Sequence, residues 1–485
     1  MEVYCQLAIL AVFAIVCWRT MPPPARKKLL GVCLGLMCLD VETTRQGSYI
    51  IKGLGAFQVA GLALLVLFGR AMLGVARGRW RLPKEPVIAL GLFVFCGAGF
   101  LVALGTAMEE SNIIASWNIF WWARVCALGL VAFMTAAALV RDVGEFDKLL
   151  WIVCLSALVT AACLAVGVPQ PGEAIGDTEI NWLDVSGRLG GTALLGFWPS
   201  TPLGPLQFGI PMNAPQLGEF AMIGLAGSVA YFLGHPRPAA RRMAGGCAVL
   251  LTGVIVLAQA RGAFTGAVAG FVVSAVLMLG YPGVGQRIGV IRRIFIISGV
   301  VATLVVGISL WQFSRTDTGT LTTARASTMM TPGRDETLQG RIGLWGPALD
   351  LAVSKPLGSG FFASFEQSQI RNPHDFYLWL LLGTGWIGAA AFFVVLGRVC
   401  FILRAGLTEA PPERVLVNIA VLSMVGAVAV TGLTSVFFAR AAHVTSFWVL
   451  MGAATAINLD ARRGIAAGLS PRGRVLAGTA EAGLY

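Results

Sequence analysis

Histidine and arginine are the residue types of this chain whose positions suggest chemistry. The chain has three histidines, and His374 follows Asn372 and Pro373, which suit a helix N-cap and the first helical position. His374 would then lie in the first turn of a helix. The positive end of that helix disfavours an imidazolium, so a neutral imidazole able to accept a proton near pH 7 is expected. A histidine with satisfied hydrogen bonds is the structural alternative, and His374 alone does not decide between the two.

Arginines lie in the same polar segments and at the same helix ends as His374. Arg261, in LAQARGAFTGAVAG (257–270), separates two apolar runs by a tight turn, where a charge is costly unless it is paired or functional. The planar guanidinium fits phosphate oxygens, so several arginines around one cavity would hold a diphosphate without a metal. Snorkelling towards lipid headgroups is the alternative for Arg261. The other arginines of these segments are Arg188, Arg315, Arg325, Arg334, Arg341 and Arg371.

The composition indicates what kind of elements must position these residues. Hydrophobic residues make up 56% of the 485 residues and charged residues 12%, roughly half the charged fraction of a soluble protein. Apolar runs recur along the whole chain, which predicts an all-α polytopic membrane protein with about 12–13 transmembrane helices. The net charge of +12 is explained by the basic loops of such a protein, and no nucleic-acid partner is expected.

The apolar runs and the polar segments between them predict the order of the elements. Helices are expected at residues 4–18, 29–41, 53–69, 87–105, 119–140, 149–168, 213–233, 244–260, 262–280, 294–311, 375–397, 415–437 and 443–458. The chain divides into N-terminal helices (1–168), a loop (169–212), central helices (213–311), a large loop (312–373), C-terminal helices (374–458) and a tail (459–485). Within the large loop, GRIGLWGPALDLAV (340–353) has apolar residues at helical spacing, which predicts an amphipathic helix on the membrane.

Basic residues predict the orientation of these helices. Every second break between the apolar runs is rich in lysine and arginine, and these breaks hold 24 of the 36 basic residues. By the positive-inside rule they are cytoplasmic, so the N-terminus and both long loops lie outside and the C-terminus inside. The first run is expected to stay as a span, because Glu2 stands where a signal peptide would be basic. His235 would then be solvated in a cytoplasmic loop, and His443 would lie at the outer interface.

Several stretches resemble one family, the O-antigen ligases and O-antigen or exopolysaccharide polymerases of bacterial envelopes. HDFYLWLLLGTGWIG (374–388) is similar to the family's histidine, Tyr-Leu, leucine and paired-glycine pattern. GRIGLWGPALDLAVSKPLGSGFFASF (340–365) resembles its Arg, Trp and Pro-Leu-x-Gly-x-Gly segment, and the Arg-Gly turn at 261–262 resembles its Ser-Arg. Weaker similarities cover RLGGT (188–192) and NAPQLGEFA (213–221). Asp375 and Gly383 depart from the family, which commonly has Asn and often Glu at those positions.

The resemblance implies a GT-C-like glycosyltransferase acting at the periplasmic face of the bacterial inner membrane. Its donor would be a glycan on undecaprenyl diphosphate, and its acceptor a hydroxyl of a glycan or of lipid A-core. His374 would be the catalytic base, and Arg188, Arg261 and Arg341 would hold the diphosphate. The transfer would be inverting and independent of metal or other cofactor. The sequence does not decide between ligase and polymerase.

Two other functions would use different features of the chain. A transporter or flippase of lipid-linked oligosaccharide would place charges at the bilayer midplane, whereas Arg124 and Glu219 are predicted near outer helix ends. A metal-dependent glycosyltransferase would use paired acids, and the pairs available are Glu109 with Glu110 and Asp40 with Glu42. They are interpreted as ordinary loop acids, because no histidine joins them. All ten cysteines lie in or beside apolar runs, which argues against a thiolate metal site.

Overall fold

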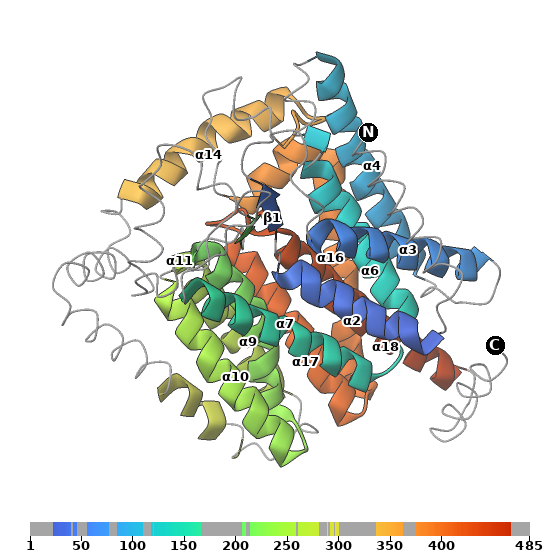
Figure 1. Cartoon of the computed structure of the whole chain (residues 1–485), viewed down its shortest axis with the longest axis vertical. Helices are drawn as coiled ribbons and strands as arrows, with labels where there is room; N and C mark the ends of the chain where they lie inside the picture. Colours follow the sequence, from blue (N-terminus) through green and yellow to red (C-terminus); the bar gives the residue numbers. More distant parts are fainter. Residues whose placement is uncertain are drawn as a thin grey trace.

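The computed structural model places a helix in each predicted apolar run that it describes (Figure 1). The described residues are 23–39, 42–45, 56–76, 85–109, 118–119, 121–165, 206–209, 214–258, 260–280, 289, 292–294, 296–299, 336–361 and 375–466. The predicted span 4–18, most of the span 294–311, and most of the two long loops lie outside these ranges.

The helices follow the predicted order closely. In chain order, the elements are α2 (Pro23–Leu39), β1 (Glu42–Arg45), α3 (Ala56–Ala76), α4 (Pro86–Glu109), the π-helix η1 (Ala123–Ala127), α6 (Leu128–Leu139), α7 (Val143–Ala165), β2 (Leu206–Gly209), α9 (Ala214–Gly234), α10 (Pro238–Leu257), α11 (Arg261–Gly280), α14 (Glu336–Ser354), α16 (Phe376–Glu409), α17 (Pro412–Thr431), the 3-10 helix η4 (Phe437–Ala439) and α18 (Ala441–Ala466). Among the described residues, seven helices are long and apolar enough to cross a membrane. The chain is therefore an all-α polytopic membrane protein, with one short antiparallel ladder between β1 and β2.

Ion pairs join the basic breaks at one end of the bundle, which is the end predicted to be cytoplasmic and is called the inner end. The pairs are Lys27 with Glu145, Arg141 with Asp460 at 3.0 Å, and Arg398 with Glu85 at 2.6 Å. Each pair joins two segments that the alternation of basic breaks predicted on the same side. At the opposite, outer end, β1 pairs with β2, which joins two segments predicted outside. α16 differs from the prediction because it continues past Arg398 to Glu409.

The C-terminal helices connect two groups of helices. α9 and α11 pack on α17, whereas α4 packs on α16 and α6 packs on α18. In Figure 1 the green group and the blue group lie on either side of the orange and red helices. α9 and α18 are almost entirely buried, because neighbouring helices cover them on all sides. The ends of these two helices are therefore held firmly with respect to α11, α16 and α17.

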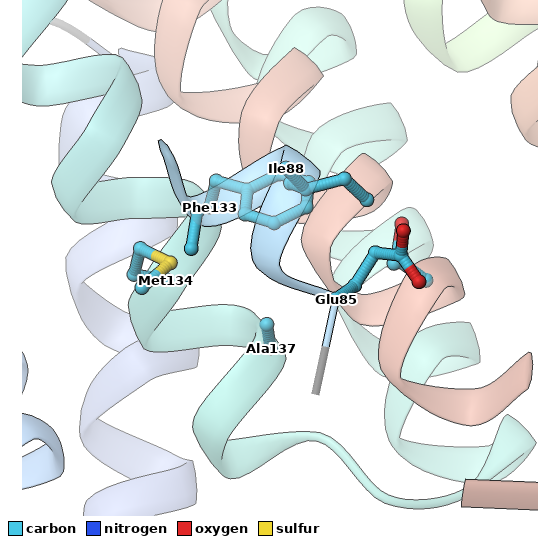
Figure 2. Close-up of a pocket in the computed structure, with 7 residues that line it drawn as sticks. Glu85, Ile88, Phe133, Met134 and Ala137 are labelled. Atoms are coloured by element: carbon cyan, nitrogen blue, oxygen red, sulfur yellow. The ribbon is translucent and has the colours of Figure 1, made fainter. Parts of the chain in front are cut away.

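A small hollow lies at the inner end, between α4, α6 and α18 (Figure 2). Its lining residues are Glu85, Ile88, Ala89, Phe133, Met134, Ala137 and Thr455. Most of the lining is apolar, and Glu85 is engaged by Arg398. This hollow is at the other end of the bundle from the start of α16, so the candidate site must be built from the outer helix ends.

Candidate functional site at the outer helix ends

The helix after His374 begins later than the sequence predicted. Its N-cap is Asp375, whose carboxylate Oδ1 accepts a hydrogen bond from the Leu378 N–H at 2.9 Å. The predicted cap at Asn372 is therefore wrong, because this side-chain bond starts the helix at Phe376, and His374 directly precedes the cap. Burial raises the pKa of the Asp375 carboxyl above its usual value, against the lowering effect of backbone hydrogen bonds from Leu378 and Tyr377. His374 itself lies outside the described residues.

One turn joins the starts of α11 and α16. The Phe376 N–H donates to the Gly432 carbonyl oxygen at 2.7 Å, which gives a partner to one of the N–H groups left over at a helix start. The hydroxyl of the preceding residue, Thr431, donates to the Gly262 carbonyl oxygen at 2.9 Å. Gly262, which follows Arg261, and Phe376, which is two residues after His374, are thus bonded to two consecutive residues.

The other predicted phosphate-binding arginines are placed only in part. Arg261 is the first residue of α11, and Arg341 lies in α14, but both side chains, together with the whole of Arg188, lie outside the described residues. α14 is the predicted amphipathic helix. Ala348 and Ala352 on one of its faces pack against Leu382 of α16, so the helix that carries Arg341 lies beside the first half of the helix that follows His374.

The Pro-Leu-x-Gly-x-Gly segment docks onto a break in α16. At Gly385 the backbone has φ 67° and ψ 180°, in the left-handed range that favours glycine. The N–H groups of residues 359–360 donate to the Leu382 carbonyl oxygen at 2.8 and 3.1 Å, and the Trp386 N–H donates to the Pro356 carbonyl oxygen at 3.0 Å. The loop thus takes up the backbone groups that the break leaves without helical partners.

Close packing around this loop explains one departure from the family pattern. The ring of Phe361 lies 4.7 Å from the ring of Trp379, between ring centres. It also fills the space that a side chain at Gly383 would need. A glutamate at position 383, as the family often has, would therefore displace Phe361 from its packed position.

The remaining residues of the histidine motif hold α16 against its neighbours. The Tyr377 hydroxyl donates to the Ala429 carbonyl oxygen of α17 at 2.6 Å. Leu378 and Leu381 pack beside Leu382 against α14. These contacts give the tyrosine and the leucines of the motif a packing role.

Comparison with known families supports the resemblance to O-antigen ligases and polymerases that the sequence motifs indicated. Residues 246–393 match the family model described as O-antigen ligase. The chain carries an O-antigen ligase domain. This ligase domain runs from α10 to the first half of α16 and includes Arg261, Arg341 and His374, whereas Arg188 precedes it. The match supports the family that the sequence predicted and an O-antigen ligase-type function in general. No curated protein matches the chain.

Most of the buried ionisable side chains lie at the outer end of the bundle, where α9, α11 and α16 start. Five side chains of the Asp, Glu, Lys, Arg and His types are buried among the described residues: Arg124, Glu219, His235, Asp375 and His443. All except His235 lie at the outer end, where Arg124 and Glu219 were predicted. Two predictions are wrong. His235 is not solvated but packs on the ring of Tyr231, and His443 is not interfacial but has no exposed surface, because the turn after α17 folds over it.

We expect Gly385→Ala to destabilise the ligase domain by about 1–3 kcal/mol, because alanine is strained at positive φ. Its Cβ would also collide with the carbonyl group of Leu357. Thermal unfolding of the detergent-solubilised protein measures the effect. Gly397→Ala is the matched control, since it lies in the same helix with nothing within 4 Å of the added Cβ, and it should be neutral or slightly stabilising. Equal midpoints for the two variants would contradict the structural role of the break.

Proposed function

We propose that this protein transfers a glycan from undecaprenyl diphosphate to a sugar hydroxyl at the periplasmic face of the bacterial inner membrane. The acceptor is a hydroxyl of a glycan or of lipid A-core. The observation that carries the proposal is the turn at Thr431–Gly432, which bonds to Gly262, next to Arg261, and to Phe376, two residues after His374. It supports the presence of a basic diphosphate site and a proton acceptor at one place.

The proposed reaction is a single displacement at the anomeric carbon of the donor. The acceptor oxygen forms a bond to that carbon while the bond from carbon to phosphate oxygen breaks, so the configuration inverts. The acceptor's proton passes to the neutral imidazole of His374. The diphosphate leaves with its electron pair, and Arg188, Arg261 and Arg341 stabilise the growing negative charge.

The orientation of the bundle supports a periplasmic site. The inner end carries the ion-paired basic segments, and the positive-inside rule assigns such segments to the cytoplasm. The starts of α11 and α16 lie at the opposite end. A lipid-linked donor presented at the outer leaflet would therefore meet Arg261 and His374 without crossing the bilayer.

Deletion of the gene tests the proposal and separates its two forms. We expect long surface glycan chains to be lost, because the proposed enzyme makes the bond that extends or attaches them. Gel analysis of lipopolysaccharide and exopolysaccharide measures this. Single repeat units that remain attached would identify a polymerase, and lipid A-core without any glycan would identify a ligase. Unchanged glycans in both fractions would contradict the proposal, as would purified protein that moves lipid-linked glycan across vesicles without forming a glycosidic bond.

A further inference from the structure

His443 is held by two carbonyl groups from different parts of the chain. Its ring atom Nδ1 lies 2.7 Å from the Phe437 carbonyl oxygen, and Nε2 lies 3.0 Å from the Gln216 carbonyl oxygen. The ring also stacks on Phe437, with the ring centres 4.8 Å apart, and no part of it is exposed. A neutral imidazole has one N–H, so it can donate to only one of these carbonyl groups at a time, and the ring lies between the two with one face on Phe437.

Two side-chain bonds strengthen the same connection. The Arg440 Nε–H donates to Gln216 Oε1 at 2.8 Å, and the Ser435 hydroxyl donates to the carboxylate of Glu219. Gln216 and Glu219 belong to the first turns of α9, whereas Ser435 and Arg440 belong to the outer turn, residues 431–440. Together with His443, these bonds fix the outer turn to the start of α9.

The outer turn is also the segment on which the candidate site rests. It bonds to Gly262 through Thr431 and to Phe376 through Gly432. α9 reaches the site directly as well: a Cβ at Gly218 would come within 2.7 Å of the side chain of Ala260, the residue before Arg261. The position of α9 relative to the outer turn thus sets the spacing between the starts of α11 and α16.

Burying such groups inside a membrane protein is costly, and well-packed apolar residues would often stabilise a core equally well. Their gathering beside Arg261 and the start of α16 calls for a reason other than stability. Next to the outer turn, the π-helix η1 carries the buried Arg124 and contacts η4, and π-helical turns are frequent at functional sites.

We propose that His443 and Glu219 are positioning residues of the ligase domain. They hold the outer turn against α9 at the place where it sets the separation of the starts of α11 and α16. Neither residue touches the substrate in this role. The inference rests on the proposed glycosyl transfer, and it adds two residues to that site which lie outside the segment matching the family model.

The experiment compares purified, detergent-solubilised variants in a transfer assay with a lipid-diphosphate-linked glycan as donor. We expect His443→Leu to lower kcat by about 10–100-fold with little change in the KM of either substrate, because small displacements of catalytic groups have effects of this size. His443→Gln should recover most of the loss, since its amide can reach a carbonyl group. Ser435→Ala, a smaller change that removes the bond to Glu219, should lower kcat by about 3–10-fold.

Asn458→Leu is the matched control. Asn458 is buried in α18 and forms two hydrogen bonds, at 3.0 and 2.6 Å, with Asn418 of α17 in the inner half of the bundle. Its replacement should lower the thermal midpoint as much as His443→Leu does and leave kcat near the wild-type value. The same loss of kcat in Asn458→Leu, or wild-type kcat in Ser435→Ala or in folded His443→Leu, overturns the positioning role. If His443→Leu does not fold, the result for Ser435→Ala decides alone. Absence of transfer by the wild-type protein overturns the proposed function instead.

Discussion

Replacing His374 with alanine is expected to lower turnover by about 10²–10⁴-fold, the usual contribution of a positioned general base. The loss should fall on kcat, because the histidine accepts the hydroxyl proton only as the new bond forms. Binding of the lipid-diphosphate donor should be largely kept, since the arginines rather than the histidine are proposed to hold the diphosphate. Steady-state kinetics together with a donor-binding measurement on the purified variant checks both expectations.

His235→Asn is the matched control for this prediction. His235 lies at the inner end, where its Nδ1 accepts the Arg237 N–H at 3.1 Å, and the side-chain oxygen of asparagine can accept the same bond. The variant should keep wild-type kcat. Full turnover by His374→Ala would end the assignment of a catalytic base at this position, whereas loss of donor binding would move the histidine from catalysis to substrate binding.

The sequence predicted the helices and the polar segments between them because the membrane imposes long apolar runs. The start of a helix at Arg261 could be predicted from a tight turn, and the start of a helix near Asp375 from a proline-containing loop. The amphipathic α14 was predictable for a similar reason, since the spacing of its apolar residues is a local property of the chain. The family motif indicated that His374 and Arg341 correspond to motif residues of the family. It did not show what the other motif positions do.

Tertiary contacts decided the features that the sequence did not reveal. The break at Gly385 depends on a loop that takes up the freed backbone groups, and glycine is common enough in membrane helices to give no signal alone. His443 looked like an interfacial residue because it starts a span next to Arg440. Its burial follows from the fold of residues 431–440. Of the two carbonyl groups beside its ring, that of Gln216 is remote in sequence and that of Phe437 lies in an irregular segment. The one signal in the sequence for this cluster was that His443, Arg124 and Glu219 were all predicted at the same membrane face.

Arg261→Lys is expected to lower kcat/KM for transfer by about 10–100-fold, because lysine keeps the charge but loses the planar fork. The loss corresponds to one charge-assisted hydrogen bond of about 1.5–3 kcal/mol. The protein should remain folded, since residue 261 is the first residue of α11 and lysine is a good helix former. Transfer kinetics and a thermal unfolding curve for the same preparation separate lost chemistry from lost structure.

Arg404→Lys tests whether any exchange of arginine for lysine has this effect. Arg404 is exposed on α16 near its inner end, so the control variant should transfer glycan at the wild-type rate. If Arg261 only anchored lipid headgroups, a lysine would snorkel equally well and Arg261→Lys would be as active as the control. The stronger impairment expected for Arg261 follows from the transition state of the proposed reaction. Negative charge on the leaving diphosphate grows as the sugar–phosphate bond breaks, and a bidentate guanidinium would stabilise that charge most when it is greatest.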